Sequence, residues 1–225
     1  MVEWEQKPSW VAVFDILGFK SLIQDAERSF PRSLLTNRLS ELVELLEGEI
    51  GARARIEYLV FSDTFVLLAP DLEIQHYPWF LLICTHLIER SIQVELPLRG
   101  AISAGSVFIS RQPQMLLGSA FLEAYEYQED QDWVGLVLTP SASGLARSHG
   151  LEPRHHDFVS DDAVPMRKLK SADVLAYRFQ NGAASFRSPL IRHLEQMRHF
   201  APEVAKGKFQ RTIEFIDRHY RYTSR

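Results

Sequence analysis

The sequence of 225 residues contains a single cysteine, Cys84, so the chain cannot form an internal disulfide. Free cysteine is among the most often buried residue types, and Cys84 stands in an apolar helical pattern, which predicts a buried thiol. No apolar run approaches the roughly 20 residues needed to span a bilayer, and the first residues carry neither a basic nor an apolar signal segment. These absences predict a cytoplasmic protein with no direct membrane insertion.

Excess positive charge is also lacking. The chain carries 25 Lys and Arg against 29 Asp and Glu, a formal net charge of −4. A general nucleic-acid binder normally shows a basic excess or stripe, so the composition predicts no nucleic-acid partner. The sequence has no Walker-type phosphate loop, and His155 and His156 lie on a polar stretch without the further ligands of a zinc site. A small polyanion such as a nucleotide needs only a few local cations and stays compatible with this composition.

Strand and helix patterns alternate along the chain. Apolar runs rich in β-branched and aromatic residues predict strands over 10–16, 56–61, 64–69, 98–104, 106–110, 133–138 and 174–179. Helical periodicity predicts helices over 21–28, 33–49, 78–93, 117–128 and 141–148, and a mostly helical segment over 190–222 interrupted near Pro202 and Gly207. Gly51 is expected to end the second helix. This order is typical of a sheet with helices packed on it, and it predicts an α+β fold, an α/β sandwich.

Two acidic residues stand where predicted strands end. Asp15 follows a run of uncharged residues, and Asp63 lies in the tight turn between the strands over 56–61 and 64–69. An acid at the end of a buried strand is costly unless it is paired or bound to a cation. Mg²⁺ is typically held by one or two carboxylates plus substrate phosphates. The two acids therefore predict a site for a hard cation, with the alternative that Asp15 caps the next helix and Asp63 is only a turn residue.

Four segments of the chain carry a resemblance to a known family. They are DILGFK at 15–20, FSDTF at 61–65, LRGAISAG at 98–105 and the stretch 118–129. In this order they resemble segments of the class III adenylate and guanylate cyclases. These are the Asp-Ile-x-Gly-Phe-Thr segment, the hairpin with the second metal-binding Asp, the Arg-x-Gly-Ile-His-x-Gly strand and a helix that begins at a glycine. The match covers roughly residues 10–140.

By this resemblance, residues 1–180 form a ferredoxin-like class III nucleotide-cyclase domain, and residues 181–225 form a helical extension packed on the same domain or on a dimer partner. The resemblance implies two divalent cations, Mg²⁺ or Mn²⁺, bound by Asp15, the carbonyl oxygen of Ile16 and Asp63. It also implies a nucleoside triphosphate as substrate and a homodimer in which two subunits share the active sites.

The resemblance also implies which groups contact the phosphates. Backbone N–H groups of Gly18, Phe19 and Lys20 stand at an expected helix start, which is an anion site on physical grounds. Arg99 matches the family's contact to the β- and γ-phosphates, and its planar guanidinium can bind phosphate oxygens bidentately. Asp15, Asp63 and Arg99 are therefore the expected catalytic residues.

The helix that aligns over 118–129 lacks the family's transition-state residues. The positions of its Asn and Arg hold Leu122 and Glu126. Leucine offers no hydrogen bond, and a glutamate has the wrong charge for a phosphate. The usual stabilisers are therefore absent or come from elsewhere, with four basic residues as candidates: Lys20, Arg147, Lys168 and Lys170.

The positions that read a purine also differ. Leu59 and Met115 stand where purine cyclases place polar residues, and neither can hydrogen-bond adenine or guanine. The chain thus resembles the short pyrimidine cyclases of bacterial Pycsar anti-phage systems, which make cyclic UMP or cyclic CMP for a separate effector protein. Tyr58 and Met115 would help to form a tighter base pocket. The alternatives are a degenerate domain that acts as nucleotide sensor or dimerisation module, and an atypical purine cyclase. The base, the activating signal and the effector stay open.

Overall fold

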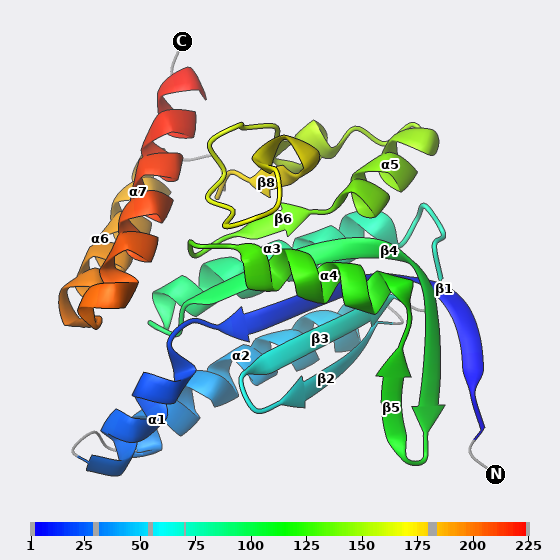
Figure 1. The fold of residues 1–225 in the computed structure, drawn as a ribbon, viewed down its shortest axis with the longest axis horizontal. Helices are drawn as coiled ribbons and strands as arrows, with labels where there is room; N and C mark the ends of the chain where they lie inside the picture. Colours follow the sequence, from blue (N-terminus) through cyan, green and yellow to red (C-terminus); the bar gives the residue numbers. More distant parts are fainter. Residues whose placement is uncertain (1–2, 29–31, 54–55, 70, 180–183, 224–225) are drawn as a thin grey trace.

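A computed structural model describes residues 3–28, 32–53, 56–69, 71–179 and 184–223. Within them the strands form one mixed sheet in the order β2-β3-β1-β4-β6-β8-β7, with β5 paired to β4. These strands are β1 (Glu5–Ile16), β2 (Glu57–Phe61), β3 (Thr64–Ala69), β4 (Leu98–Arg111), β5 (Gln114–Leu117), β6 (Leu136–Leu138), β7 (Phe158–Val159) and β8 (Leu175–Tyr177). The two longest, β1 and β4, run antiparallel side by side (Figure 1).

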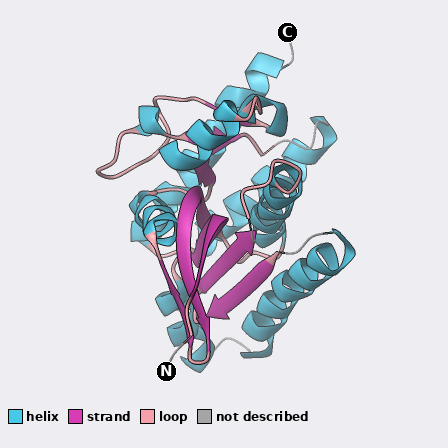
Figure 2. Ribbon diagram, turned by 90° about the vertical axis from the view of Figure 1, so that its right-hand side faces the viewer, coloured by secondary structure: helices cyan, strands magenta, loops and turns pink. Residues whose placement is uncertain are grey.

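Helices cover both faces of this sheet. They are α1 (Phe19–Arg28), α2 (Arg32–Arg53), α3 (Tyr77–Gln93), α4 (Ser119–Asp130), α5 (Pro140–Ser148), α6 (Ala184–Phe200) and α7 (Glu203–Thr223), with the short 3₁₀ helices η1 (Pro153–His156) and η2 (Ser171–Asp173). α4 packs on β1 and β4 in front of the sheet, whereas α2 and α3 lie behind it (Figure 1). Figure 2 shows the strands between the helices from a second direction.

Side chains along β1 alternate between two apolar cores. Trp10 and Ala12 belong to the larger core, which β1 shares with α2 and α3, and Val11 and Val13 belong to a smaller core under α4. All four are buried. Because successive side chains of a strand point to opposite faces, Asp15 lies on the same face as the two valines, toward α4.

Most predicted elements are confirmed, and the α+β architecture with them. The strands predicted over 98–104 and 106–110 are instead one strand, β4, because Gly105 pairs with β1 as its neighbours do. The helices expected to end near Gly51 and to break at Gly207 continue through both glycines, which a helix tolerates at a cost of about 1 kcal/mol each. The sequence patterns do not predict β5 or β7, which are both short.

The C-terminal helices α6 and α7 pack on each other and stand beside one end of the sheet (Figure 1). Thr212 Oγ1 of α7 accepts a hydrogen bond from the Val134 N–H (2.9 Å) and lies 3.1 Å from the Val134 carbonyl oxygen. The rings of Trp133 and Phe215 pack with their centroids 4.6 Å apart. These contacts attach α7 to the segment that precedes β6.

Three further expectations concern the whole chain. Cys84 is buried in α3 as predicted, and burial raises the pKa of its thiol. The division into a domain over 1–180 and an extension over 181–225 stays a prediction, and residues 180–183 at its boundary lie outside the described residues. No helix in the described part of the chain is long and apolar enough to cross a membrane.

Candidate active site

Strand pairing brings Asp15, Asp63 and Arg99 to one edge of the sheet. β1 lies between β3 and β4, and Asp15 stands opposite Thr64 in β3 and opposite Arg99 in β4. The N–H of Ile16 donates a hydrogen bond to the carbonyl oxygen of Asp63 (3.0 Å), in the turn between β2 and β3. Three residues that are far apart in the chain therefore meet where β1 ends.

Asp15 and Arg99 form an ion pair that is largely shielded from solvent. Nε and Nη2 of Arg99 both donate to Oδ2 of Asp15, at 3.0 and 2.9 Å. The side chains are 20% exposed for Asp15 and 12% exposed for Arg99. Burial raises the pKa of Asp15, Arg99 opposes that effect, and the neighbouring carboxyl of Asp63 adds to it. As a result the pKa of Asp15 lies above its usual value.

The two carboxyl groups fit a divalent cation. Burial is the main cause of the raised pKa of Asp15, and repulsion from the neighbouring Asp63 carboxylate adds a smaller contribution. A cation between them would remove the repulsion. Both Arg99 bonds go to Oδ2 of Asp15, so Oδ1 can serve as a ligand atom. One or two carboxylates plus phosphate oxygens form the ligand set that Mg²⁺ usually takes.

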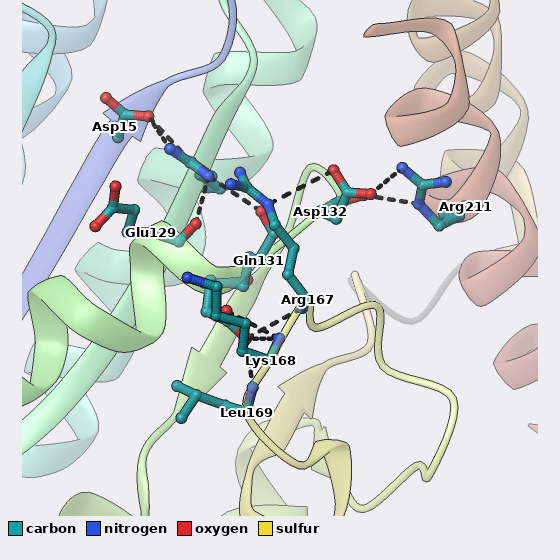
Figure 3. A network of polar contacts seen from close by, with 10 residues as sticks. Asp15, Glu129, Gln131, Asp132, Arg167, Lys168, Leu169 and Arg211 are labelled. Carbon is teal, nitrogen blue, oxygen red and sulfur yellow. Dashed lines mark hydrogen bonds and ion pairs between the residues drawn. The ribbon is translucent and has the colours of Figure 1, made fainter. Parts of the chain in front are cut away.

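Arg99 also binds the C-terminal end of α4. Its Nη1 donates to the carbonyl oxygens of Glu129 (2.8 Å) and Gln131 (3.1 Å) (Figure 3). One N–H from Nε, one from Nη2 and two from Nη1 are thus used inside the protein, out of the five that a guanidinium offers. The geometry shows Arg99 as the group that holds Asp15 in place. Its expected contact with the β- and γ-phosphates stays a prediction.

The turn after β1 leads directly into α1. Gly18 has a φ of 77°, a left-handed conformation that favours glycine. Its carbonyl oxygen accepts hydrogen bonds from the N–H groups of Ser21 (2.9 Å) and Leu22 (3.1 Å). Phe19 packs against the larger core and Lys20 is exposed. The N–H groups at 18–20 therefore stand at a helix start next to Asp15, as predicted, whereas their contact with phosphates stays a prediction.

A cavity of about 410 Å³ lies between β2 and the hairpin of β4 and β5. Tyr58, Leu59 and Met115 all line it, so the structure brings the three predicted base-binding residues together. Ser110 lines the same cavity, and its buried hydroxyl has no hydrogen-bond partner among the described residues. The sequence gives no signal for Ser110, because a lone serine in a strand belongs to no motif. Binding of a base here stays a prediction.

α4 offers no phosphate-binding side chain at the two positions of the family's stabilisers. Leu122 is 55% exposed, and Glu126 is exposed as well. Both therefore point away from the two apolar cores, and neither supplies a positive charge to the end of β1. Any residue that stabilises the transition state in their place must therefore lie outside α4.

One of the candidate cations lies in a loop bound to the end of α4. The N–H groups of Arg167, Lys168 and Leu169 donate to the carboxylate of Asp130 at 2.8 to 3.1 Å (Figure 3). Asp130 is buried, and these hydrogen bonds hold the loop against it. Lys168 therefore lies beside the end of α4 that Arg99 also contacts. Arg147, in contrast, belongs to α5.

A separate group of potential metal ligands lies elsewhere. Ligand atoms of Asp71, Glu73 and His76 lie within 4.8 Å of one another, and Asp71 Oδ1 is 2.8 Å from His76 Nδ1. This acidic cluster follows Ala69 at the end of β3, whereas Asp63 precedes the start of that strand. It is therefore at the opposite end of β3 and is not part of the site around Asp15.

No protein-family model and no curated protein matches the sequence, but solved structures do. The catalytic core of a rhodopsin-guanylyl cyclase with converted specificity, in complex with ATPαS, has a TM-score of 0.55 at 14% identity, covering 77% of this chain and 97% of that chain. The adenylyl cyclase CyaB from P. aeruginosa has a TM-score of 0.55 at 13% identity, covering 78% and 94%. This chain has the class III nucleotide-cyclase fold. A class III adenylyl cyclase-like ATP-binding protein from Pseudomonas aeruginosa is also similar, with a TM-score of 0.52 at 12% identity, covering 63% of this chain and 35% of that chain.

The cyclase fold predicted from four short segments is thus confirmed. The two cyclase cores are covered almost completely, whereas between a fifth and a quarter of this chain extends beyond the match, since 77% and 78% of it are covered. Sequence identities of 12 to 14% support a common fold and nothing further, so the activity has to be inferred from the residues of the site.

Proposed function

We propose that this chain is a metal-dependent nucleotide cyclase that converts a pyrimidine nucleoside triphosphate, UTP or CTP, into a 3′,5′-cyclic nucleotide and pyrophosphate. One observation carries the proposal. The carboxyl groups of Asp15 and Asp63 meet at the end of β1, in a fold that guanylyl and adenylyl cyclases share. The fold alone would leave the function open, because one fold hosts many chemistries.

The acids at the end of β1 would hold the cations. Asp15, the carbonyl oxygen of Ile16 and Asp63 would bind two divalent ions, Mg²⁺ or Mn²⁺. When bound, such ions lower the pKa of the ribose 3′-hydroxyl and neutralise charge on the triphosphate. Arg99 fixes the orientation of Asp15 by two hydrogen bonds to Oδ2, so this ligand is already positioned before the substrate arrives.

The reaction is an internal displacement at phosphorus. The 3′-oxygen loses its proton and attacks the α-phosphorus, and the bond from that phosphorus to the oxygen bridging to the β-phosphate breaks to release pyrophosphate. The N–H groups at 18–20 would hold the triphosphate from one side. Catalysis then depends mainly on positioning and charge, and it needs no covalent bond to the protein.

The residues that line the cavity beside β2 support the assignment of a small base. Leu59 and Met115 give it apolar walls that cannot hydrogen-bond a purine, and Tyr58 extends them. Ser110 places a buried hydroxyl without a partner, among the described residues, in the same walls. An unpaired buried hydroxyl is unfavourable, and a polar atom of a bound base would satisfy it. A pyrimidine is the smaller class of base and suits a pocket with few polar groups.

A homodimer with shared active sites belongs to the same proposal. Large apolar side chains are exposed on three elements: Phe61 on β2 (84%), Leu117 on β5 (56%) and Leu122 on α4 (55%). Exposed apolar surface is typical of association sites, and two-fold dimers are the commonest oligomers. By the resemblance to Pycsar cyclases, the cyclic product would be a second messenger of bacterial anti-phage signalling, read by a separate effector protein.

Nucleotide binding without cyclisation is a second candidate function. Arg99 uses four N–H groups inside the protein, and Leu122 and Glu126 supply no positive charge from α4. A protein of the same fold is described as cyclase-like and ATP-binding. In this case the domain would sense a nucleotide or hold a dimer together.

Incubation of the purified protein with each of the four ribonucleoside triphosphates and Mn²⁺ separates these functions. Mass spectrometry of the products should show cyclic UMP or cyclic CMP, and Asp63→Asn should remove the product. A cyclic purine would contradict the base assignment while keeping the cyclase. If no triphosphate gives a product but one of them binds, the nucleotide sensor is the function.

A further inference from the structure

Neither Arg99 nor α4 supplies an available positive charge for the far end of a triphosphate at the site around Asp15. Arg99 donates to Asp15 and to two carbonyl oxygens. α4 carries Leu122 and Glu126 at the two positions that the resemblance assigns to phosphate-stabilising residues. A polyphosphate that enters this site needs cationic groups from another element, because unscreened phosphate charges repel each other strongly outside water.

Helix α7, which is far along the chain from Asp15, packs beside this site. Arg211 Nε donates to the carbonyl oxygen of Asp132 (2.8 Å), and its guanidinium pairs with the Asp132 carboxylate (Figure 3). Asp132 follows Gln131, whose carbonyl oxygen accepts from Arg99. Thr212, the next residue of α7, is fastened to Val134. The helix is therefore fixed one residue away from the partners of Arg99.

Lys208 lies on the same side of α7 as these anchors. It precedes Arg211 by three residues and Thr212 by four, the spacing that puts side chains on one helix face. It is half-buried, and no carboxylate among the described residues pairs with its ammonium group. Arg99 and Arg211, in contrast, each have a carboxylate partner. The helix thus places near the site an ammonium group that pairs with no carboxylate in the described part of the chain.

The electrostatic surroundings of Lys208 include the residues of the site. Burial lowers the pKa of Lys208, the positive charge of Arg99 lowers it further, and Arg167 adds to the effect. Asp132 and Asp15 oppose the shift without cancelling it. A cation in this environment is short of negative charge, and an anion bound nearby would supply it.

We propose that Lys208 binds the polyphosphate chain of the nucleotide, from the side of the site formed by α7. The inference rests on the proposed function, since it assigns one more substrate contact to the same site. A lysine ammonium is a compact charge with three donors and suits the non-bridging oxygens of the β- and γ-phosphates. The sequence gives no signal for it, because Lys208 lies far along the chain from the segments that resemble a cyclase.

The test uses the full chain, Mn²⁺ and inorganic tripolyphosphate as the probe, with affinity measured by calorimetry. Lys208→Gln should weaken binding about tenfold to hundredfold, the loss expected for one charge-assisted hydrogen-bonding group. Lys208→Arg keeps the charge and should bind within a few-fold of the wild type. Lys206→Gln is the matched control, because Lys206 lies on the same helix and pairs with Glu203 (2.7 Å). It should bind as the wild type does.

Thermal unfolding separates binding from misfolding. Because burial and like charges already disfavour the Lys208 cation, Lys208→Gln should unfold at the same temperature or higher. Equal tripolyphosphate affinities of Lys208→Gln and the wild type, or no binding by the wild type, overturn the inference.

The outcome is distinct from that of the proposed function. If the wild type produces cyclic nucleotides while Lys208→Gln keeps its KM and kcat, the inference fails and the cyclase stands. If no triphosphate is cyclised but Lys208→Gln still loses tripolyphosphate, the cyclase fails and the polyphosphate contact stands.

Discussion

Arg99 shows at the scale of a single residue how the candidate site is held together. Its guanidinium joins the end of β1, through Asp15, to the last carbonyl groups of α4. The pair is only 12 to 20% exposed, so removal of either charge leaves the other without compensation in a partly dry place. Arg111, on the same strand, is also paired with an acid, Glu57, but its side chain is 66% exposed.

Replacement of Arg99 is therefore expected to cost much more than replacement of Arg111. Arg99→Gln should lower the free energy of unfolding by about 3 kcal/mol, because it leaves the Asp15 carboxylate unpaired. Arg111→Gln should leave it almost unchanged, since solvent screens an exposed pair. Urea unfolding of the two variants measures both values. Equal losses would show that Arg99 does not hold Asp15.

The second acid should matter for activity and not for folding. Asp63→Asn keeps the size of the side chain and removes a charge that repels Asp15, so we expect no loss of stability. Cyclic nucleotide production should fall by about a thousandfold or more, because a cation ligand is lost. Product assays measure the activity of this variant, and circular dichroism checks that it folds as the wild type does. Activity within a few-fold of the wild type would remove Asp63 from the site.

At the scale of elements, α7 depends on an acid from the loop after β7. Asp161 pairs with Arg218 and with His219, whose Nε2 is 2.8 Å from Asp161 Oδ2. Burial raises the pKa of Asp161, but the Ala163 N–H, His219 and Arg218 together outweigh burial and hold the pKa below its usual value. The ionised form of Asp161 is therefore better stabilised in the folded chain than in the unfolded one.

This gives a pH dependence with a definite sign. A carboxyl group with a depressed folded-state pKa contributes stability above its unfolded pKa of about 3.9 and loses it as the pH falls through the folded value. Asp161→Asn should therefore lower the free energy of unfolding by about 2 kcal/mol at pH 7, and the difference from the wild type should shrink below about pH 4. Asp162→Asn, at the neighbouring exposed position, is the control. A difference that stays constant down to pH 3 would contradict this account.

At the scale of the whole molecule, the base cavity and the paired acids are separate features of one chain. The cavity lies between β2 and the β4–β5 hairpin, and the acids lie at the end of β1. In the proposed dimer, the cavity of one subunit serves the acids of the other. Two variants that are inactive for different reasons can then restore each other.

We expect such complementation between Asp63→Asn and Met115→Arg. The first lacks a cation ligand, and the second fills the cavity with a charged side chain. In a random mixture half of the dimers combine both variants, and each of these has one intact site, so activity should reach about a quarter of the wild type. Each variant alone should be inactive. If each chain holds its own complete site, the mixture will stay inactive as well.

The sequence by itself determined the elements and the acids between them. The apolar run that forms β1 and the turn at Ser62 and Asp63 are local features, and they could be predicted together with the four segments that resemble a cyclase. The local sequence pattern wrongly predicted that an element ends or breaks at Gly51, Gly105 and Gly207. Glycine weakens a helix or a strand, but packing on neighbouring elements lets each element continue through these positions.

Only the tertiary structure decided which side chains meet. The register of β1 against β4 sets Arg99 opposite Asp15, and this pairing takes up the guanidinium that the motif assigned to phosphate. The return of α7 to Asp132 sets Lys208 beside the same pair. Periodicity reports which face of an element is apolar. The partner of a charged side chain depends on contacts between segments far apart in the chain, and those are fixed only when the sheet and its helices pack together.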